Sequence, residues 1–198
     1  GTWNTLTEEM ATQTIGNGHI SKDSTNTHVV NELDIPVKVL GISNAVVAAG
    51  PDGILVTDKE ASPRIKEMVR DLDQRPMYEE RRWGWYRVLD YTKFDDREVL
   101  TKRIKVHKGK NLSYQYHAKR NEVWTIINGE GKFVLNEEIR RVKQGDVLRI
   151  PIKSKHGIKA ITDLEFIEVQ SGSELIEEDI VRIFMTWEEV EQHCLHVN

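Results

Sequence analysis

The sequence has little of what marks secreted, membrane-spanning or nucleic-acid-binding proteins. It contains one cysteine, Cys194, so no disulfide can form within the chain, and we expect a cytoplasmic protein. It has no apolar run long enough to span a bilayer, and no signal peptide is visible at its start. The formal net charge is only −4, which gives no reason to expect a nucleic-acid or membrane partner.

Short β-rich segments are what the sequence does contain, and in residues 1–72 they recur at close spacing. Turn signals such as "GPDG" at 50–53 separate the runs "THVVNE", "VKVLGI", "AVVAAG" and "GILVTD". This spacing predicts a short β-solenoid-like segment of the left-handed β-helix type, which we expect to pair subunits. A helix is predicted over 62–74, with Ser62 as its N-cap and Pro63 in its first turn. Residues 73–81 are expected to be a linker.

From residue 82 to 184 the pattern is that of an all-β domain. Eight or nine short strand candidates follow one another without a long helix, which indicates a sandwich or a closed barrel. A short amphipathic helix is expected in the last part, 185–198. Thr186 would be its N-cap and Glu189 the partner three positions later.

Four side chains in the β domain have the chemistry of metal ligands. In a strand, alternate residues share a face, so Gln115 and His117 point the same way, and Glu122 lies on the inner face of the next strand. His156 follows a third strand and a proline turn. If these faces point inward, an amide oxygen, two imidazoles and one carboxylate converge, a set that suits zinc, with iron, manganese or cobalt as alternatives.

Each of these residues taken alone has an ordinary explanation. A strand histidine is more often a surface or a satisfied core residue than a ligand, and one glutamine is only a polar strand residue. Together they are harder to explain without a ligand, because burying them unpaired would be costly.

Two runs containing these residues resemble the cupin motifs. The run 109–129, "GKNLSYQYHAKRNEVWTIING", resembles the first motif, with Gln115 in place of its first histidine. The run 145–156 resembles the second, although Lys153 replaces the usual glycine and Ala160 the usual asparagine. The Gln-x-His variant, with "RRWGWYRVL", "TKRIKV" and "FIEVQSGSELIEEDIVRIF", resembles the C-terminal domain of type II mannose-6-phosphate isomerases. The resemblance implies a cupin jelly-roll barrel and a bound zinc ion.

The N-terminal segment resembles the same family of fused enzymes. "GTWNTLTEEM" looks like the segment that follows the catalytic aspartate of a mannose-1-phosphate guanylyltransferase. That aspartate and the glycine-rich nucleotide loop are not in this sequence. We therefore expect part of a longer or processed protein, and we expect the guanylyltransferase chemistry to be absent from this chain.

The resemblance also implies a reaction, the interconversion of mannose 6-phosphate and fructose 6-phosphate. Lys102 alternates with apolar residues, so it should point inward and bind sugar oxygens or move a proton, unless it extends to the rim. Arg182 matches the arginine that the family places near the sugar phosphate, and its alternative is a salt bridge with Glu178. Glu168 and Gln170 share one strand face and either line the pocket or face solvent. The proton-transfer base cannot be named from the sequence.

The sequence is compatible with three functions. The first is a zinc-dependent isomerase, expected as a homodimer, that supplies precursors of GDP-mannose and polysaccharides. The second is a non-catalytic sugar-phosphate-binding or assembly domain, because a fold alone does not give activity. The third is another sugar-phosphate isomerase or epimerase on the same scaffold.

Overall fold

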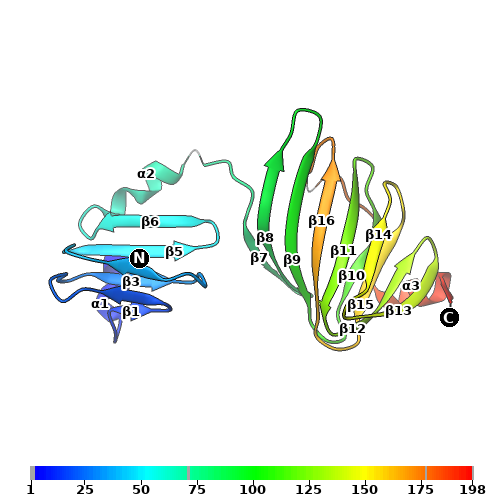
Figure 1. Cartoon of the computed structure of the whole chain (residues 1–198), viewed down its shortest axis with the longest axis horizontal. Coiled ribbons are helices and arrows are strands. Elements are labelled where there is room, and N and C mark those ends of the chain that lie inside the picture. The colour runs from blue at the N-terminus through cyan, green and yellow to red at the C-terminus, as the bar shows by residue number, and fades with distance from the viewer. Residues whose placement is uncertain (1–2, 71, 177, 198) are drawn as a thin grey trace. The chain divides into compact units, whose positions relative to one another are not determined.

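The structure, a computed structural model, describes residues 3–70, 72–176 and 178–197. The chain divides into two compact units, one ending at Pro76 and the other beginning at Met77 (Figure 1). Each has its own hydrophobic core. Within the described residues, no helix is both long and apolar enough to cross a membrane.

The first unit is built from short, mostly parallel strands. Its sheet has the order β1-β3-β5-β6, and β2 pairs with β4 beside it. The pairs β1–β3, β3–β5 and β2–β4 are parallel, whereas β5 and β6 form an antiparallel hairpin. The elements are α1 (Trp3–Glu9), β1 (Thr14–Ile15), β2 (Gly18–Ile20), β3 (His28–Asn31), β4 (Val37–Val39), β5 (Ala45–Gly50), β6 (Gly53–Asp58), the 3-10 helix η1 (Ser62–Arg64) and α2 (Ile65–Val69).

Successive turns of this unit stack at a spacing of 18 residues. His28 pairs with Val46, and the Asn26 side-chain amide donates to Asn44 Oδ1 at 2.7 Å. Both asparagines have positive φ, 47° and 58°, a conformation that asparagine tolerates better than most residues. These pairings show that the strands stack, but they do not give the handedness of a helical path through the strands. The left-handed β-solenoid therefore stays a prediction.

The helical segment in this region is shorter than the predicted range 62–74, and its N-cap is a different residue. The chain forms the 3-10 turn η1 and then α2, and the N-cap position belongs to Ala61. Ser62 is therefore not the N-cap, and its buried Oγ has no hydrogen-bond partner among the described residues. The turn before the helix is instead held by Asp58, whose Oδ1 accepts from the backbone N–H groups of Glu60 and Ala61. Residue 71 lies outside the described residues.

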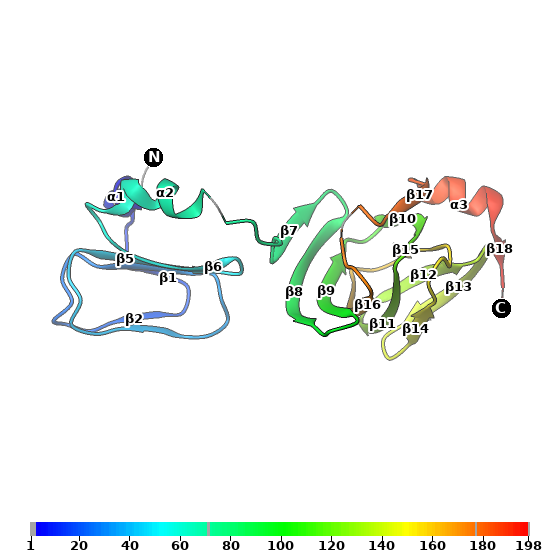
Figure 2. The same ribbon diagram turned by 90° about the horizontal axis from the view of Figure 1, so that it is seen from above.

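The second unit is a jelly roll of two six-stranded sheets. The sheet orders are β14-β11-β16-β9-β8-β7 and β17-β10-β15-β12-β13-β18, and Figure 2 shows the two layers. Its elements are β7 (Tyr78–Arg81), β8 (Gly84–Lys93), β9 (Glu98–Val106), β10 (Asn111–Tyr116), β11 (Arg120–Asn128), β12 (Glu130–Leu135), β13 (Glu138–Lys143), β14 (Val147–Ile150), β15 (His156–Ala160), β16 (Leu164–Gly172), β17 (Val181–Phe184), α3 (Trp187–His193) and β18 (Leu195–His196).

The inner faces of three neighbouring strands change from apolar to polar along their length. In β16, Leu164 and Phe166 are buried, and the same face continues with buried Glu168 and Gln170. Strands β9 and β11 likewise bury polar side chains beside apolar ones. The apolar part forms the core, and the polar part provides the functional groups described below.

The two ends of the unit differ in part from the sequence-based prediction. The expected linker, 73–81, ends in strand β7, which pairs with β8. The capping box of Thr186 and Glu189 is confirmed. The C-terminal helix is shorter than predicted, because α3 ends at His193 and β18 then pairs with β13.

Candidate metal centre

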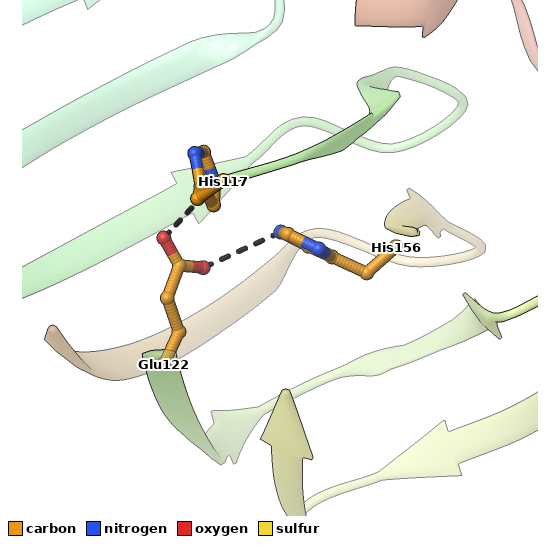
Figure 3. A group of neighbouring side chains, drawn as sticks. All are labelled: His117, Glu122 and His156. Atoms are coloured by element: carbon orange, nitrogen blue, oxygen red, sulfur yellow. Dashed lines mark ion pairs between the residues drawn. The ribbon is translucent and has the colours of Figure 1, made fainter. Parts of the chain in front are cut away.

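Three predicted ligands, His117, Glu122 and His156, meet inside the jelly roll (Figure 3). His117 directly follows β10, Glu122 lies in β11, and His156 opens β15. One ligand atom from each lies within 4.8 Å of the others. The histidine Nε2 atoms are 3.2 Å and 3.4 Å from the two oxygens of Glu122, and all three side chains are at most 2% exposed.

Hydrogen bonds at the far side of each ring determine which nitrogen faces the centre. Nδ1 of His117 lies 2.5 Å from the carbonyl oxygen of Asp179, and Nδ1 of His156 lies 3.0 Å from that of Ser154. A carbonyl oxygen only accepts, so both Nδ1 atoms carry the proton in the neutral rings. Both Nε2 lone pairs then face the carboxylate of Glu122.

This arrangement fits a bound cation. Lone pairs that face a carboxylate repel it unless a positive charge lies between them, and at His117 the Arg120 guanidinium, 3.4 Å from Nε2, supplies part of that charge. Nε2 of His156 has no hydrogen-bond partner among the described residues, although it is buried. Imidazole nitrogens held by carbonyl groups and one ionised carboxylate are donors that zinc and related divalent ions accept. The three residues can therefore hold a metal ion, whose identity the donor set does not determine.

Gln115, the fourth predicted ligand, lies at the edge of this group. It pairs with His156 across β10 and β15, and its Nε2 lies 3.4 Å from His117 Nε2. Its Oε1 accepts instead from Ser113 Oγ at 2.7 Å. The structure brings Gln115 to the centre but turns its oxygen away, so its role as a ligand stays a prediction.

Two donors that sequence reasoning missed hold the carboxylate of Glu122. Arg120 Nε donates to Oε1 at 3.0 Å, and Trp124 Nε1 donates to Oε2 at 3.1 Å. Burial on its own would raise the pKa of Glu122, but His156, His117 and Arg120 together lower that pKa. Burial lowers the pKa of His117. The centre therefore favours an ionised Glu122 beside neutral imidazoles, the protonation states that metal binding needs.

A pocket of about 670 Å³ opens beside the centre, and the predicted substrate residues line it. Lys102 is 5% exposed, with its Nζ 4.5 Å from the centroid of the Tyr86 ring, so it does not extend to the rim. Glu168 pairs with Lys102 and accepts from Trp124 and from Gln170 at 3.1 Å and 2.9 Å. Burial, together with the charge of Glu122, raises the pKa of Glu168 to about 8.

Arg182 also lines the pocket, on its exposed side. It pairs with Gln115 across β10 and β17, and it forms no ion pair with Glu178 within the described part of the chain. Tyr86 was missed by the sequence reasoning, although the alternation of β8 carries a signal, because Tyr86 shares an inner face with Gly84 and Val88. Its hydroxyl donates to Glu79.

Known proteins similar to this chain are named for mannose-1-phosphate guanylyl transfer and for xanthan biosynthesis. Mannose-1-phosphate guanylyltransferase ManC of Salmonella typhimurium is 31% identical over 195 residues, which cover 92% of this chain and 40% of that protein. The xanthan biosynthesis protein XanB of Xanthomonas campestris is 31% identical, covering 94% of this chain and 42% of its own length. The chain thus spans about two fifths of the length of these relatives.

The chain is also similar to a solved structure and matches a family model. A Klebsiella pneumoniae protein with a double-stranded β-helix domain aligns with a TM-score of 0.38 and 22% identity, over 44% of this chain and 76% of that one. The model of the mannose-6-phosphate isomerase C-terminal family matches residues 70–184. This match spans more than half of the sequence and nearly all the strands of the second unit. The chain belongs to the mannose-6-phosphate isomerase C-terminal family.

Proposed function

We propose that this chain is a metal-dependent aldose–ketose isomerase that interconverts mannose 6-phosphate and fructose 6-phosphate, a step that supplies precursors of GDP-mannose and polysaccharides. One observation carries the proposal. A buried set of His117, Glu122 and His156 adjoins a pocket rich in cationic side chains, in a chain of the isomerase C-terminal family. Buried ionisable groups in a pocket are characteristic of functional sites.

The reaction moves a proton between C1 and C2 of the open sugar, and negative charge develops on the sugar oxygens meanwhile. A zinc ion held by the three residues, or iron, manganese or cobalt in its place, would supply Lewis-acid stabilisation of that charge. Glu122 is the one carboxylate among the three, so its single charge leaves the centre electrophilic. Arg120 and Trp124 hold that carboxylate in place.

Other pocket residues bind and orient the sugar in this proposal. Lys102 brings an ammonium group into a buried space, where it can donate to a sugar oxygen or take part in proton transfer. Glu168 and Gln170 are hydrogen-bonded to each other, and both residues line the same pocket. Arg182 contributes positive charge on the open side.

A turnover assay tests the proposal. The purified chain is given mannose 6-phosphate, and fructose 6-phosphate is measured with added zinc and then with a chelator. Turnover that the chelator abolishes and a metal ion restores is the expected result. A folded, metal-loaded sample without turnover would contradict it.

Replacing Lys102 separates catalysis from metal binding. Lys102→Met should lower kcat at least about 100-fold, the size of a lost acid–base or charge-stabilising group, with bound metal unchanged. Lys105→Met is the matched control, because Lys105 lies on the same strand and pairs outward with Asp163 at 3.2 Å. A kcat for Lys102→Met equal to that of the control would remove Lys102 from the mechanism.

The second candidate is a non-catalytic sugar-phosphate-binding or assembly domain. It is favoured by the names of several relatives, which describe guanylyl transfer rather than isomerisation. Metal binding without turnover on any sugar phosphate would support it. Turnover on a different sugar phosphate would instead point to another isomerase or epimerase on this scaffold.

A further inference from the structure

The charges around the pocket are unbalanced. Two carboxylates line it, Glu122 and Glu168, against six cationic side chains, which are Arg81, Arg82, Lys102, Lys110, Arg120 and Arg182. A pocket with this excess of positive charge attracts an anion. The position of that anion depends on which cations are already neutralised.

Three of the six cations have acidic neighbours. Arg120 donates to Glu122 at 3.0 Å, and Arg81 pairs with Glu79 at 2.6 Å. Lys102 lies opposite buried Glu168 in the strand register. In the part of the chain that the structure describes, the other three form no ion pair, and these are Arg82, Lys110 and Arg182.

The backbone segments that carry Arg82 and Lys110 adjoin each other, and both residues line the pocket. Trp83 O accepts from His107 N at 2.9 Å, and His107 O accepts from Lys110 N at 2.9 Å, so the turn before β8 adjoins the turn before β10. Arg182, which the family resemblance would place near the sugar phosphate, lies at the other end, opposite Gln115, so a phosphate held by Arg82 and Lys110 departs from that expectation. Two cations facing one space repel each other, and a dianion between them relieves that repulsion.

Strand pairing shows how far apart along β9 the two ends of the site lie. On the metal side, Glu122 pairs with Gln170, and Gln170 pairs with Leu100 of β9. On the side of Arg82, Gly84 pairs with Val106, the last residue of β9. The six residue steps from Leu100 to Val106 span about 20 Å at the rise of a strand. Long side chains reaching in from both ends leave space between them for a small phosphorylated molecule.

We propose that Arg82 and Lys110 bind the phosphate dianion of the sugar phosphate, at the end of the pocket remote from Glu122. Arginine offers a planar fork of donors and lysine a mobile point charge, a pairing that suits phosphate oxygens. As the site of a substrate's phosphate, the subsite rests on the proposed function. As a phosphate-binding site it stands without it.

The phosphate subsite orients the substrate in the pocket. With C6 and its phosphate between Arg82 and Lys110, the other end of the sugar points toward Glu122, and Lys102 lies between the two ends. Lys102 then contacts the sugar rather than the phosphate. An unphosphorylated hexose would lack the contact that holds it in this direction.

Phosphate binding tests the subsite without turnover. Inorganic phosphate is titrated calorimetrically into chelator-treated wild-type protein and into Arg82→Gln, Lys110→Gln and Lys108→Gln. Lys108 is the control, because it is exposed in the same turn but does not line the pocket. We expect affinity at least about tenfold weaker in the two pocket variants, the size of a lost charge-assisted hydrogen bond, and unchanged in the control. No saturable binding to the wild type, or equal affinity in all variants, overturns the subsite.

Steady-state kinetics then separates the subsite from the proposed function. If the chain isomerises mannose 6-phosphate, both pocket variants should raise KM at least about tenfold and leave kcat within a few-fold. Weaker phosphate binding with unchanged KM would overturn the assignment to the substrate's phosphate. The pocket variants could bind phosphate more weakly while the chain turns over no sugar phosphate. That result would contradict the isomerase function and support the anion subsite.

Discussion

A single backbone contact determines how His117 presents its ring. The carbonyl of Asp179 accepts from Nδ1, and the carboxylate of Asp179 accepts from the N–H groups of Ala118 and Lys119 at 2.9 Å and 3.0 Å. The same connecting segment holds Arg120, which donates to the carbonyl of Ile176 at 3.1 Å. Residues behind a ligand orient it and adjust its basicity.

Asp179→Ala should therefore weaken metal binding without unfolding the domain. Loss of the carboxylate frees the turn at 118–119 and the carbonyl that fixes His117, and outer contacts of this kind are worth about 10- to 100-fold in metal affinity. Zinc affinity is measured by competition with a chelating dye. Glu178→Ala, at the exposed neighbouring position, is the control. An Asp179→Ala affinity equal to that of the control would show that Asp179 does not orient His117.

At the scale of single elements, strand alternation predicted the inner faces well. The runs 99–106 and 122–127 bury the side chains that the period of two predicted, Lys102 and Glu122 among them. In the run 165–170 the sequence left Glu168 open between the pocket and solvent, and the structure buries it. Strand β7 was missed because an edge strand has a partner on one side only, and its polar residues show no alternation. The contacts of Asp179 and Arg120 were not predictable, since they depend on how distant segments meet.

The capping box of α3 gives a prediction about acid stability. Thr186 donates to Glu189 from its backbone and side chain, and these hydrogen bonds lower the pKa of Glu189 below its ordinary value of 4.5. A carboxyl whose pKa is lowered on folding stabilises the folded state above its unfolded pKa. That contribution is lost as pH falls through the folded pKa.

Glu189→Gln should therefore be less stable than the wild type at pH 7, and the difference should shrink as pH falls below 4.5. Denaturant unfolding at pH 7 and at about pH 3 measures the difference. Glu188→Gln, one position earlier in the same helical turn, controls for the loss of a helix-terminal charge. A difference that stays constant over this range would mean that the ionised carboxylate does not stabilise the cap.

At the scale of the whole molecule, the chain is two units with separate cores. Val29, Val39 and Val47 form the core of the first, and the larger clusters lie in the second. All the predicted ligands and pocket residues belong to the second unit. Subunit pairing through the first unit, and a homodimer, stay predictions.

The fragment 77–198 should fold by itself and bind metal as the full chain does. Its core and its metal centre are complete within it, and a domain with its own core can fold alone. Cooperative thermal unfolding and zinc stoichiometry are compared between the fragment and the full chain. A fragment that is unfolded, or folded but unable to bind metal, would show that the first unit is needed for the centre.

The central claim is that His117 and His156 hold a metal ion on which isomerisation depends. The most direct measurement determines bound metal and turnover of mannose 6-phosphate on the same samples of wild type, His117→Ala, His156→Ala and His107→Ala. His107 is exposed and serves as the control. We predict that the first two variants lose metal and turnover together, whereas His107→Ala keeps both. Stoichiometric metal in both His117→Ala and His156→Ala would contradict the account.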